Sequence, residues 1–288
     1  MWLALLTAYA NAEPIPEAAG SFKFVDTHGN AERPITVWTY RPEGFVPGGR
    51  VVFVMHGQGR DGKRYRDAWV EFAKQQKFLL LTPEFSNVDY PSDAMYQQGY
   101  IQAFDGSIRA KEKWSLLAIE HLFDYVVQEN SLLAKRYTIY GHSGGGQFVH
   151  RLVLLHPKAR IELAVAANPG WYTMSDLETE YPYGLKGTPT DLLRLKAAFA
   201  TPLVILLGEN DTDPKHPQLR RTRDAMVQGA TRFERGHHFF EQAKKLADKT
   251  GSDFKWQMET VPHVGHTNTG MAAAAARIVD QGAVSQSQ

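Results

Sequence analysis

The chain has 288 residues, of which 43% are hydrophobic and 22% charged, the composition of an ordinary globular protein. Its 32 basic and 31 acidic residues leave a formal charge of +1, which excludes a bulk electrostatic attraction to nucleic acid, anionic membranes or strongly acidic substrates. The absence of cysteine excludes thiol catalysis and thiolate metal sites.

The chain begins with a short apolar run, from Trp2 to Ala10, that ends in the small-residue pattern Ala-Tyr-Ala. This is typical of the end of a signal peptide and its cleavage site, so residues 1–12 are interpreted as a signal-peptide remnant. We therefore expect the protein to be periplasmic or secreted. Because no Lys or Arg precedes Lys23, an apolar N-terminal arm on a cytoplasmic protein is the alternative. No other run is long enough to cross a bilayer.

Apolar runs of strand length alternate with segments of helical periodicity along most of the chain. A β-hairpin is predicted first, from residues 21–25 and 35–40. Further strands are predicted at 50–55, 78–82, 136–140, 161–167, 202–207 and 254–261. Helices are predicted at 65–75, 114–128, 147–155, 191–199, 232–249 and 271–279. This alternation predicts an α/β fold in a single domain over residues 21–288: a mostly parallel twisted sheet with an N-terminal antiparallel hairpin and helices on both faces.

The most informative motif is Gly141-His142-Ser143-Gly144-Gly145, which joins the strand at 136–140 to the helix at 147–155. A strand, Gly-x-Ser-x-Gly and a helix form the pattern of a nucleophile elbow, a sharp turn that holds the serine in a strained conformation with its hydroxyl exposed. Glycines are expected on both sides because a side chain there would collide with the neighbouring strand or helix. Ser143 is therefore the predicted nucleophile, and we expect His142 to pack beside the elbow.

A carboxylate and a histidine follow in the order that such an elbow requires. The acid is expected directly after the strand at 202–207, where Asp211 is preferred and Asp213 is the alternate. The base is expected in the loop after the last strand, where His266 is preferred and His263 is the alternate.

The strand at 50–55 ends in His56-Gly57-Gln58-Gly59, at the position of the loop that supplies one oxyanion-hole amide. Small glycines let the backbone approach a substrate oxygen. The backbone N–H groups of Gln58 and Gly144 are therefore predicted to bind the oxyanion, and His56 is expected to contact the substrate.

These four segments make the chain resemble the α/β-hydrolase superfamily, and within it the secreted esterases related to poly(3-hydroxybutyrate) depolymerases and feruloyl esterases. The resemblance covers roughly residues 21–280. The chain departs from many such depolymerases because it lacks cysteine and carries neither a polymer-binding domain nor a Ser/Thr-rich linker. These departures argue against attack on insoluble polymer.

Two long irregular segments, 83–113 and 168–189, follow strand ends on the expected active face and are rich in aromatic residues. We interpret most of these rings as packing the loops down. Trp171 and Tyr172 come directly after a strand, and we expect them to contact the substrate. The short basic run over 220–223 is interpreted as a solvated helix face.

The predicted function is hydrolysis of carboxylic esters of short-chain, hydroxyalkanoate or aromatic acids through an acyl-enzyme, with neither metal nor cofactor. The expected partner is a small-molecule or oligomeric ester, and neither nucleic acid nor a membrane is expected. A serine peptidase or amidase is the alternative, because the same triad cleaves esters and amides. A binding protein on a catalytically inactive hydrolase fold is a weaker alternative.

Overall fold

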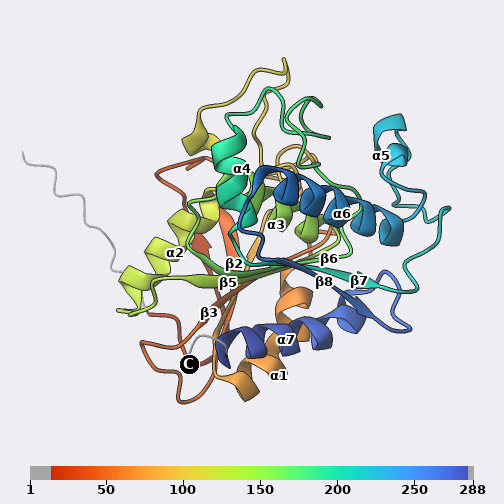
Figure 1. Ribbon diagram of the computed structural model, residues 1–288. Coiled ribbons are helices and arrows are strands. Elements are labelled where there is room, and N and C mark those ends of the chain that lie inside the picture. Colours follow the sequence, from red (N-terminus) through yellow and green to blue (C-terminus); the bar gives the residue numbers. More distant parts are fainter. Residues whose placement is uncertain (1–13, 285–288) are drawn as a thin grey trace, which may run out of the picture.

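The computed structural model describes residues 14–284, which form an eight-stranded sheet with helices on both faces (Figure 1). The strands are β1 (Ala18–Phe24), β2 (Ile35–Arg41), β3 (Val51–Met55), β4 (Leu79–Glu84), β5 (Tyr137–His142), β6 (Ile161–Ala167), β7 (Leu203–Gly208) and β8 (Trp256–Val261). Their order across the sheet is β1-β2-β4-β3-β5-β6-β7-β8. The pairs β1–β2 and β2–β4 are antiparallel, whereas the other neighbouring pairs are parallel.

The helices lie in two layers, one on each face of the sheet (Figure 1). One layer contains α1 (Gly62–Gln76) and α7 (Asn268–Val284), and the other contains α2 (Ala118–Glu129), α3 (Gly144–Leu155), α4 (Leu192–Phe199) and α6 (Arg232–Thr250). Two shorter helices, η1 (Lys111–Lys113) and α5 (Arg223–Val227), lie in connecting segments. Successive side chains of a buried strand serve both layers: Phe53 packs with the α2–α3 side and Val54 with the α1–α7 side.

The fold predicted from the sequence is confirmed, and every predicted strand and helix is present with ends that differ by a few residues. Side-chain caps explain some of these differences. Helix α1 begins earlier than its apolar periodicity because the Asp61 carboxylate accepts a hydrogen bond from the Arg64 N–H. A capping box between Thr231 and Glu234 begins α6. The predicted signal-peptide remnant at 1–12 lies outside the described residues.

Parallel pairing brings the carboxyl ends of β3, β5, β6, β7 and β8 to the same edge of the sheet. Ligands of open α/β sheets bind at this edge, because the loops that follow the strands converge there. Among residues 14–284, no helix is both long and apolar enough to span a membrane.

Candidate active site

Ser143 occupies the turn between β5 and α3 with φ 57° and ψ −114°, a backbone conformation that non-glycine residues rarely adopt. Two hydrogen bonds hold this strained turn. The Ser143 N–H donates to the Ala167 carbonyl at 2.9 Å, and the Gln147 N–H donates to the Ser143 carbonyl at 3.0 Å. The turn therefore fixes the serine at the amino end of α3, as expected for a nucleophile elbow.

The glycines of the motif are required by close backbone packing. A Cβ at position 141 would lie 2.2 Å from the Gly145 carbonyl oxygen, and one at 145 would lie 2.1 Å from the Met55 carbonyl oxygen. Both distances are far below van der Waals contact. Helix α3 thus lies against β3 and β5 so closely that only glycine fits at 141 and 145.

Three side chains from separate loops meet in a hydrogen-bonded line. His266 Nε2 lies 2.9 Å from Ser143 Oγ, and His266 Nδ1 lies 2.7 Å from Asp211 Oδ2. A neutral imidazole that donates from Nδ1 to the carboxylate has its Nε2 lone pair free to accept the serine proton. The alternates Asp213 and His263 are both exposed, so the structure brings the preferred acid and base to Ser143 and not their alternates.

Asp211 is buried and has a second partner that the sequence did not reveal. Arg232, the first residue of α6, donates from Nη1 to Asp211 Oδ1 at 3.2 Å, and both side chains are almost completely buried. Its Nη2 lies 3.1 Å from His216 Nδ1. Burial and the Arg232 charge lower the pKa of His216, which favours the neutral ring that accepts this bond. Arg232 thus holds one carboxylate oxygen and leaves the other for His266.

A buried asparagine ties together the loops that carry the acid and the base. Asn168, at the end of β6, accepts a hydrogen bond from the Gly208 N–H at 2.8 Å and donates from Nδ2 to the Gly265 carbonyl at 3.3 Å. The Asn210 N–H also donates to the Val264 carbonyl at 2.9 Å. An amide directly after an apolar strand was the only local signal for this role. Because it has both a donor and an acceptor, asparagine suits a position between two loops.

The backbone of Gln58 lies beside that of Gly144, as predicted for an oxyanion hole. A Cβ at position 144 would lie 3.1 Å from the Gln58 nitrogen, and both residues line the cavity that contains Ser143. The loop of Gln58 approaches the serine closely, since a Cβ at 57 would lie 3.6 Å from Ser143 Cβ. The amino end of α3 adds a favourable dipole for negative charge at this point.

His56 was expected to contact the substrate, but it is fully buried and does not line the cavity. Its Nε2 accepts a hydrogen bond from the Phe85 N–H at 3.0 Å, so Nδ1 is the protonated nitrogen and donates to the Gly57 carbonyl at 2.9 Å. Burial lowers the pKa of His56 to about 3, which keeps the ring neutral. Its role in the structure is to support the Gly57–Gln58 turn.

His142 packs beside the elbow, as expected for a structural residue. Its ring lies 4.9 Å from the His266 ring, and the Tyr65 hydroxyl lies 3.1 Å from its Nδ1. Burial, with a smaller contribution from His266, lowers the pKa of His142 well below its ordinary value. A neutral ring at this position supports the base without adding a charge next to it.

The two aromatic residues after β6 differ in their surroundings. Tyr172 is fully buried, stacks on Phe239 with ring centres 4.5 Å apart, and does not line the cavity of Ser143. The expected substrate contact of Tyr172 is therefore not supported, because its side chain points into the core. Trp171 does line that cavity, although only 2% of its surface is exposed.

The cavity above Ser143 has a volume of about 300 Å³ and a largely polar lining. The segments 83–113 and 168–189 both contribute to it, through Asp93 and Gln97 from the first and Gly170 and Trp171 from the second. Most other rings of these loops are buried, as expected, and Phe104 is a fully exposed exception.

The interpretation of residues 220–223 as a solvated helix face is wrong for Arg220. Arg221 and Arg223 are exposed, but Arg220 is half-buried and lines the cavity of Ser143. It precedes α5, and its guanidinium lies over the rings of Trp171 and Tyr183, 4.8 and 5.8 Å from their centres. A run of charges carries no local signal for such packing, which depends on a loop some 40 residues away in the sequence.

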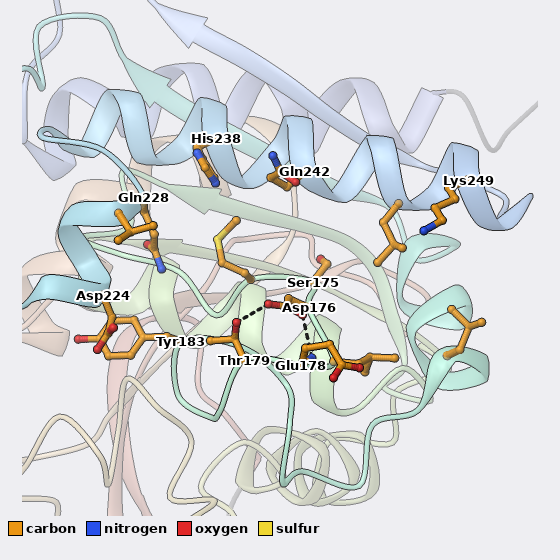
Figure 2. A pocket seen from close by; sticks show the side chains of 15 residues that line it. Ser175, Asp176, Glu178, Thr179, Tyr183, Asp224, Gln228, His238, Gln242 and Lys249 are labelled. Carbon is orange, nitrogen blue, oxygen red and sulfur yellow. Dashed lines mark hydrogen bonds between the residues drawn. The ribbon is translucent and has the colours of Figure 1, made fainter.

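A larger cavity, of about 680 Å³, lies between the 174–183 loop and helices α4, α5 and α6 (Figure 2). In this view His238, Gln242 and Lys249 come from α6, opposite Asp176 and Thr179 of the loop. None of the residues that line it is Ser143, Asp211 or His266. Within residues 14–284, no group of three or more His, Cys, Asp or Glu side chains is placed to hold a metal ion.

Comparison with solved structures places the chain in a family. It is 45% identical to poly(aspartic acid) hydrolase-1 from Sphingomonas sp. KT-1, over 92% of this chain and 99% of that one, with a TM-score of 0.89. It is 33% identical to LpqC, a poly(3-hydroxybutyrate) depolymerase from Bordetella parapertussis, over 93% and 90% of the two chains, with a TM-score of 0.88. The chain belongs to the α/β-hydrolase superfamily, among its serine esterases.

More distant structures share the fold of this α/β-hydrolase. S-formylglutathione hydrolase FrmB from Staphylococcus aureus is 17% identical over 92% of this chain and 98% of that one, with a TM-score of 0.59. No protein-family model matches the sequence, and no curated protein matches it. The resemblance to poly(3-hydroxybutyrate) depolymerases is nevertheless confirmed, and the protein is an enzyme of the carboxylic ester hydrolase class.

Proposed function

We propose that this α/β-hydrolase cleaves carboxylic esters through an acyl-enzyme on Ser143. The observation that carries the proposal is the continuous line of hydrogen bonds from Ser143 through His266 to Asp211. His266 removes the hydroxyl proton as Ser143 Oγ attacks the acyl carbon, and then returns it to the leaving alcohol. Water repeats the sequence on the acyl-enzyme and releases the acid.

The amides of Gln58 and Gly144 are proposed to stabilise the tetrahedral intermediate. Negative charge develops on the former carbonyl oxygen during attack, and a preorganised N–H donor at that point contributes roughly 3 kcal/mol. The backbone of Gln58 lies close to that of Gly144 at the amino end of α3, and this proximity supports the assignment. Asp211 keeps the imidazole in its reactive tautomer and stabilises the imidazolium that forms.

The proposed substrates are small or oligomeric esters of short-chain, hydroxyalkanoate or aromatic acids. A cavity of about 300 Å³ suits a short acyl group better than a long lipid chain. Trp171, on its wall, is proposed to contact the acyl group. Resemblance to a poly(3-hydroxybutyrate) depolymerase supports a hydroxyalkanoate among the candidates.

Cleavage of an amide is the second candidate, favoured by 45% identity to a poly(aspartic acid) hydrolase. Poly(aspartic acid) is a chain of amides, and the proposed triad acts on either type of bond.

Export of the protein to the periplasm or the medium also stays a prediction.

This proposal is tested with a panel of p-nitrophenyl esters from acetate to palmitate. Feruloyl and 3-hydroxybutyryl esters and an acyl-matched p-nitroanilide are assayed beside them. We expect kcat/KM to peak among the short, aromatic or hydroxylated acyl groups, and the anilide to be cleaved more slowly. Rates that rise steadily towards palmitate would identify a lipase instead. Faster cleavage of the anilide than of its ester would favour the amidase. No labelling by a fluorophosphonate probe would point to an inactive binding protein.

The choice of acid is tested by Asp211→Asn against Asp213→Asn. Asp211→Asn is expected to lower kcat by roughly 10⁴-fold, because an amide can donate to His266 Nδ1 and so impose the wrong tautomer. Asp213→Asn is the matched control and should stay within about threefold of the wild type, since its carboxylate is exposed and, in the part of the chain that the structure describes, accepts a hydrogen bond only from the Lys215 N–H. The reverse ranking would transfer the acid role to Asp213.

A further inference from the structure

Arg220 is a guanidinium held in place without a carboxylate partner. Its Nε donates to the Tyr183 hydroxyl at 2.8 Å, and its plane lies over Trp171. Its backbone is fixed as well, because Arg235 donates from Nη2 to the Arg220 carbonyl at 2.8 Å. Among the described residues, the two Nη groups of Arg220 donate to no acceptor, and no carboxylate lies within ion-pair distance. These donors belong to a residue that lines the cavity of Ser143.

The surroundings of this cavity carry more positive than negative charge. Arg220 and Arg232 line it, whereas Arg151 and Arg235 lie directly behind it. Arg151 donates to the Gln147 side chain and lies 4.2 Å from the centre of the Trp171 ring, and Arg235 donates to the Gly170 carbonyl. Against these four cations, the lining holds the carboxylate of Asp93, and Asp211 pairs with Arg232.

The guanidinium groups around the cavity repel one another. Burial is the main cause that lowers the pKa of Arg151 to about 10, and the charge of the neighbouring Arg220 contributes to this lowering. Burial likewise lowers the pKa of Arg235 to about 10, with an additional contribution from Arg232. An anion in the cavity would relieve this repulsion, because charges interact strongly where water is excluded.

We propose that Arg220 is the anchor of a carboxylate-binding subsite within the active cavity, so that the preferred esters carry a free carboxylate near the bond that is cleaved. This inference rests on the proposed function of Ser143. A guanidinium presents its two Nη groups in a fork that matches a carboxylate, and the Trp171 and Tyr183 rings orient that fork in advance. Preorganisation lowers the entropy that a flexible cation would lose on binding.

Two matched ester pairs test the subsite, one for each side of the scissile bond. Mono-p-nitrophenyl adipate is compared with p-nitrophenyl methyl adipate, and 4-acetoxybenzoate is compared with its methyl ester. In each pair the second compound differs only in its capped carboxylate. For the wild type we expect kcat/KM to be higher for the free carboxylate in at least one pair. Arg220→Met should lower the ratio of kcat/KM for the free carboxylate to kcat/KM for the capped ester by about 10- to 100-fold, the range for losing a hydrogen bond to a charged group.

Arg220→Lys and Arg223→Gln complete the experiment. Lysine keeps the charge but not the fork, so its ratio should fall between those of the wild type and Arg220→Met. Arg223 is exposed at the start of α5, and Arg223→Gln should keep the wild-type ratio. An unchanged ratio in both pairs for Arg220→Met would overturn the subsite. An equal fall in kcat/KM for the free-carboxylate ester and for its capped partner would also overturn it, since it would make Arg220 a packing residue. Failure of the proposed function would look different, because Ser143→Ala would then still hydrolyse the capped esters.

Discussion

Ser143→Ala is expected to lower ester hydrolysis by on the order of 10⁴-fold or more while leaving the fold intact. The reason is that the elbow places Oγ 2.9 Å from His266 Nε2, and no other hydroxyl is bonded to that nitrogen among the described residues. Alanine removes the attacking atom without adding bulk to the turn. Turnover of p-nitrophenyl acetate by the purified variant measures the effect, and fluorophosphonate labelling should disappear with it.

The thermal midpoint of Ser143→Ala serves as the control for folding. It should remain within a few degrees of the wild type, because the hydroxyl's only hydrogen bond to a described residue is the one to His266. A folded variant that kept even a tenth of the wild-type turnover would show that Ser143 is not the nucleophile.

His266→Ala is expected to have an effect as large as that of Ser143→Ala. Without the imidazole, no side chain within residues 14–284 is hydrogen-bonded to Ser143 Oγ to accept its proton, and the carboxylate of Asp211 is left without its partner at 2.7 Å. Removal of serine or histidine from such a triad costs a similar factor in kcat, because the residues act as a unit. A double variant of Ser143 and His266 should therefore be hardly slower than either single variant.

His263→Ala is the matched control for the base. His263 lies three residues earlier in the same loop, with φ 63° and an exposed side chain, and we expect its variant to keep at least about a third of the wild-type turnover. A loss in His263→Ala that exceeded the loss in His266→Ala would exchange the two assignments. Equal and large losses would mean that the loop itself, rather than one ring, is needed for activity.

The elbow could be predicted from the sequence because its determinants are local. A buried strand, glycines at 141 and 145 and a helix follow one another directly, and the backbone contacts that require these glycines arise wherever such a turn packs against β3. The order of strands and helices was predictable for the same reason, since hydrophobic periodicity depends on neighbours in the sequence. Helix ends were less accurate where a side-chain cap such as Asp61 decided them.

The sequence left two candidates for the acid and two for the base, and only the tertiary structure shows that Asp211 and His266, rather than their alternates, lie in line with Ser143. Asp211 and Asp213 occupy one loop, and their difference arises from burial against Arg232, which lies on another element. Asn168 fixes the relative position of the acid and base loops from a third strand end. A single sequence gives no measure of these distances, because they depend on how the strands are ordered in the sheet.

The sequence by itself determined the fold, and it predicted the nucleophile and a short set of candidates for its partners, because each depends on residues adjacent in the chain. Only the tertiary structure decided the surroundings of the cavity. His56 and Tyr172 proved to be buried supports, whereas Arg220 proved to lie in the active cavity. A formal charge of +1 gave no indication that four arginines line or adjoin the cavity that contains Ser143, since net charge is a sum over the whole chain. The local field depends on which charges the fold brings together and shields from water.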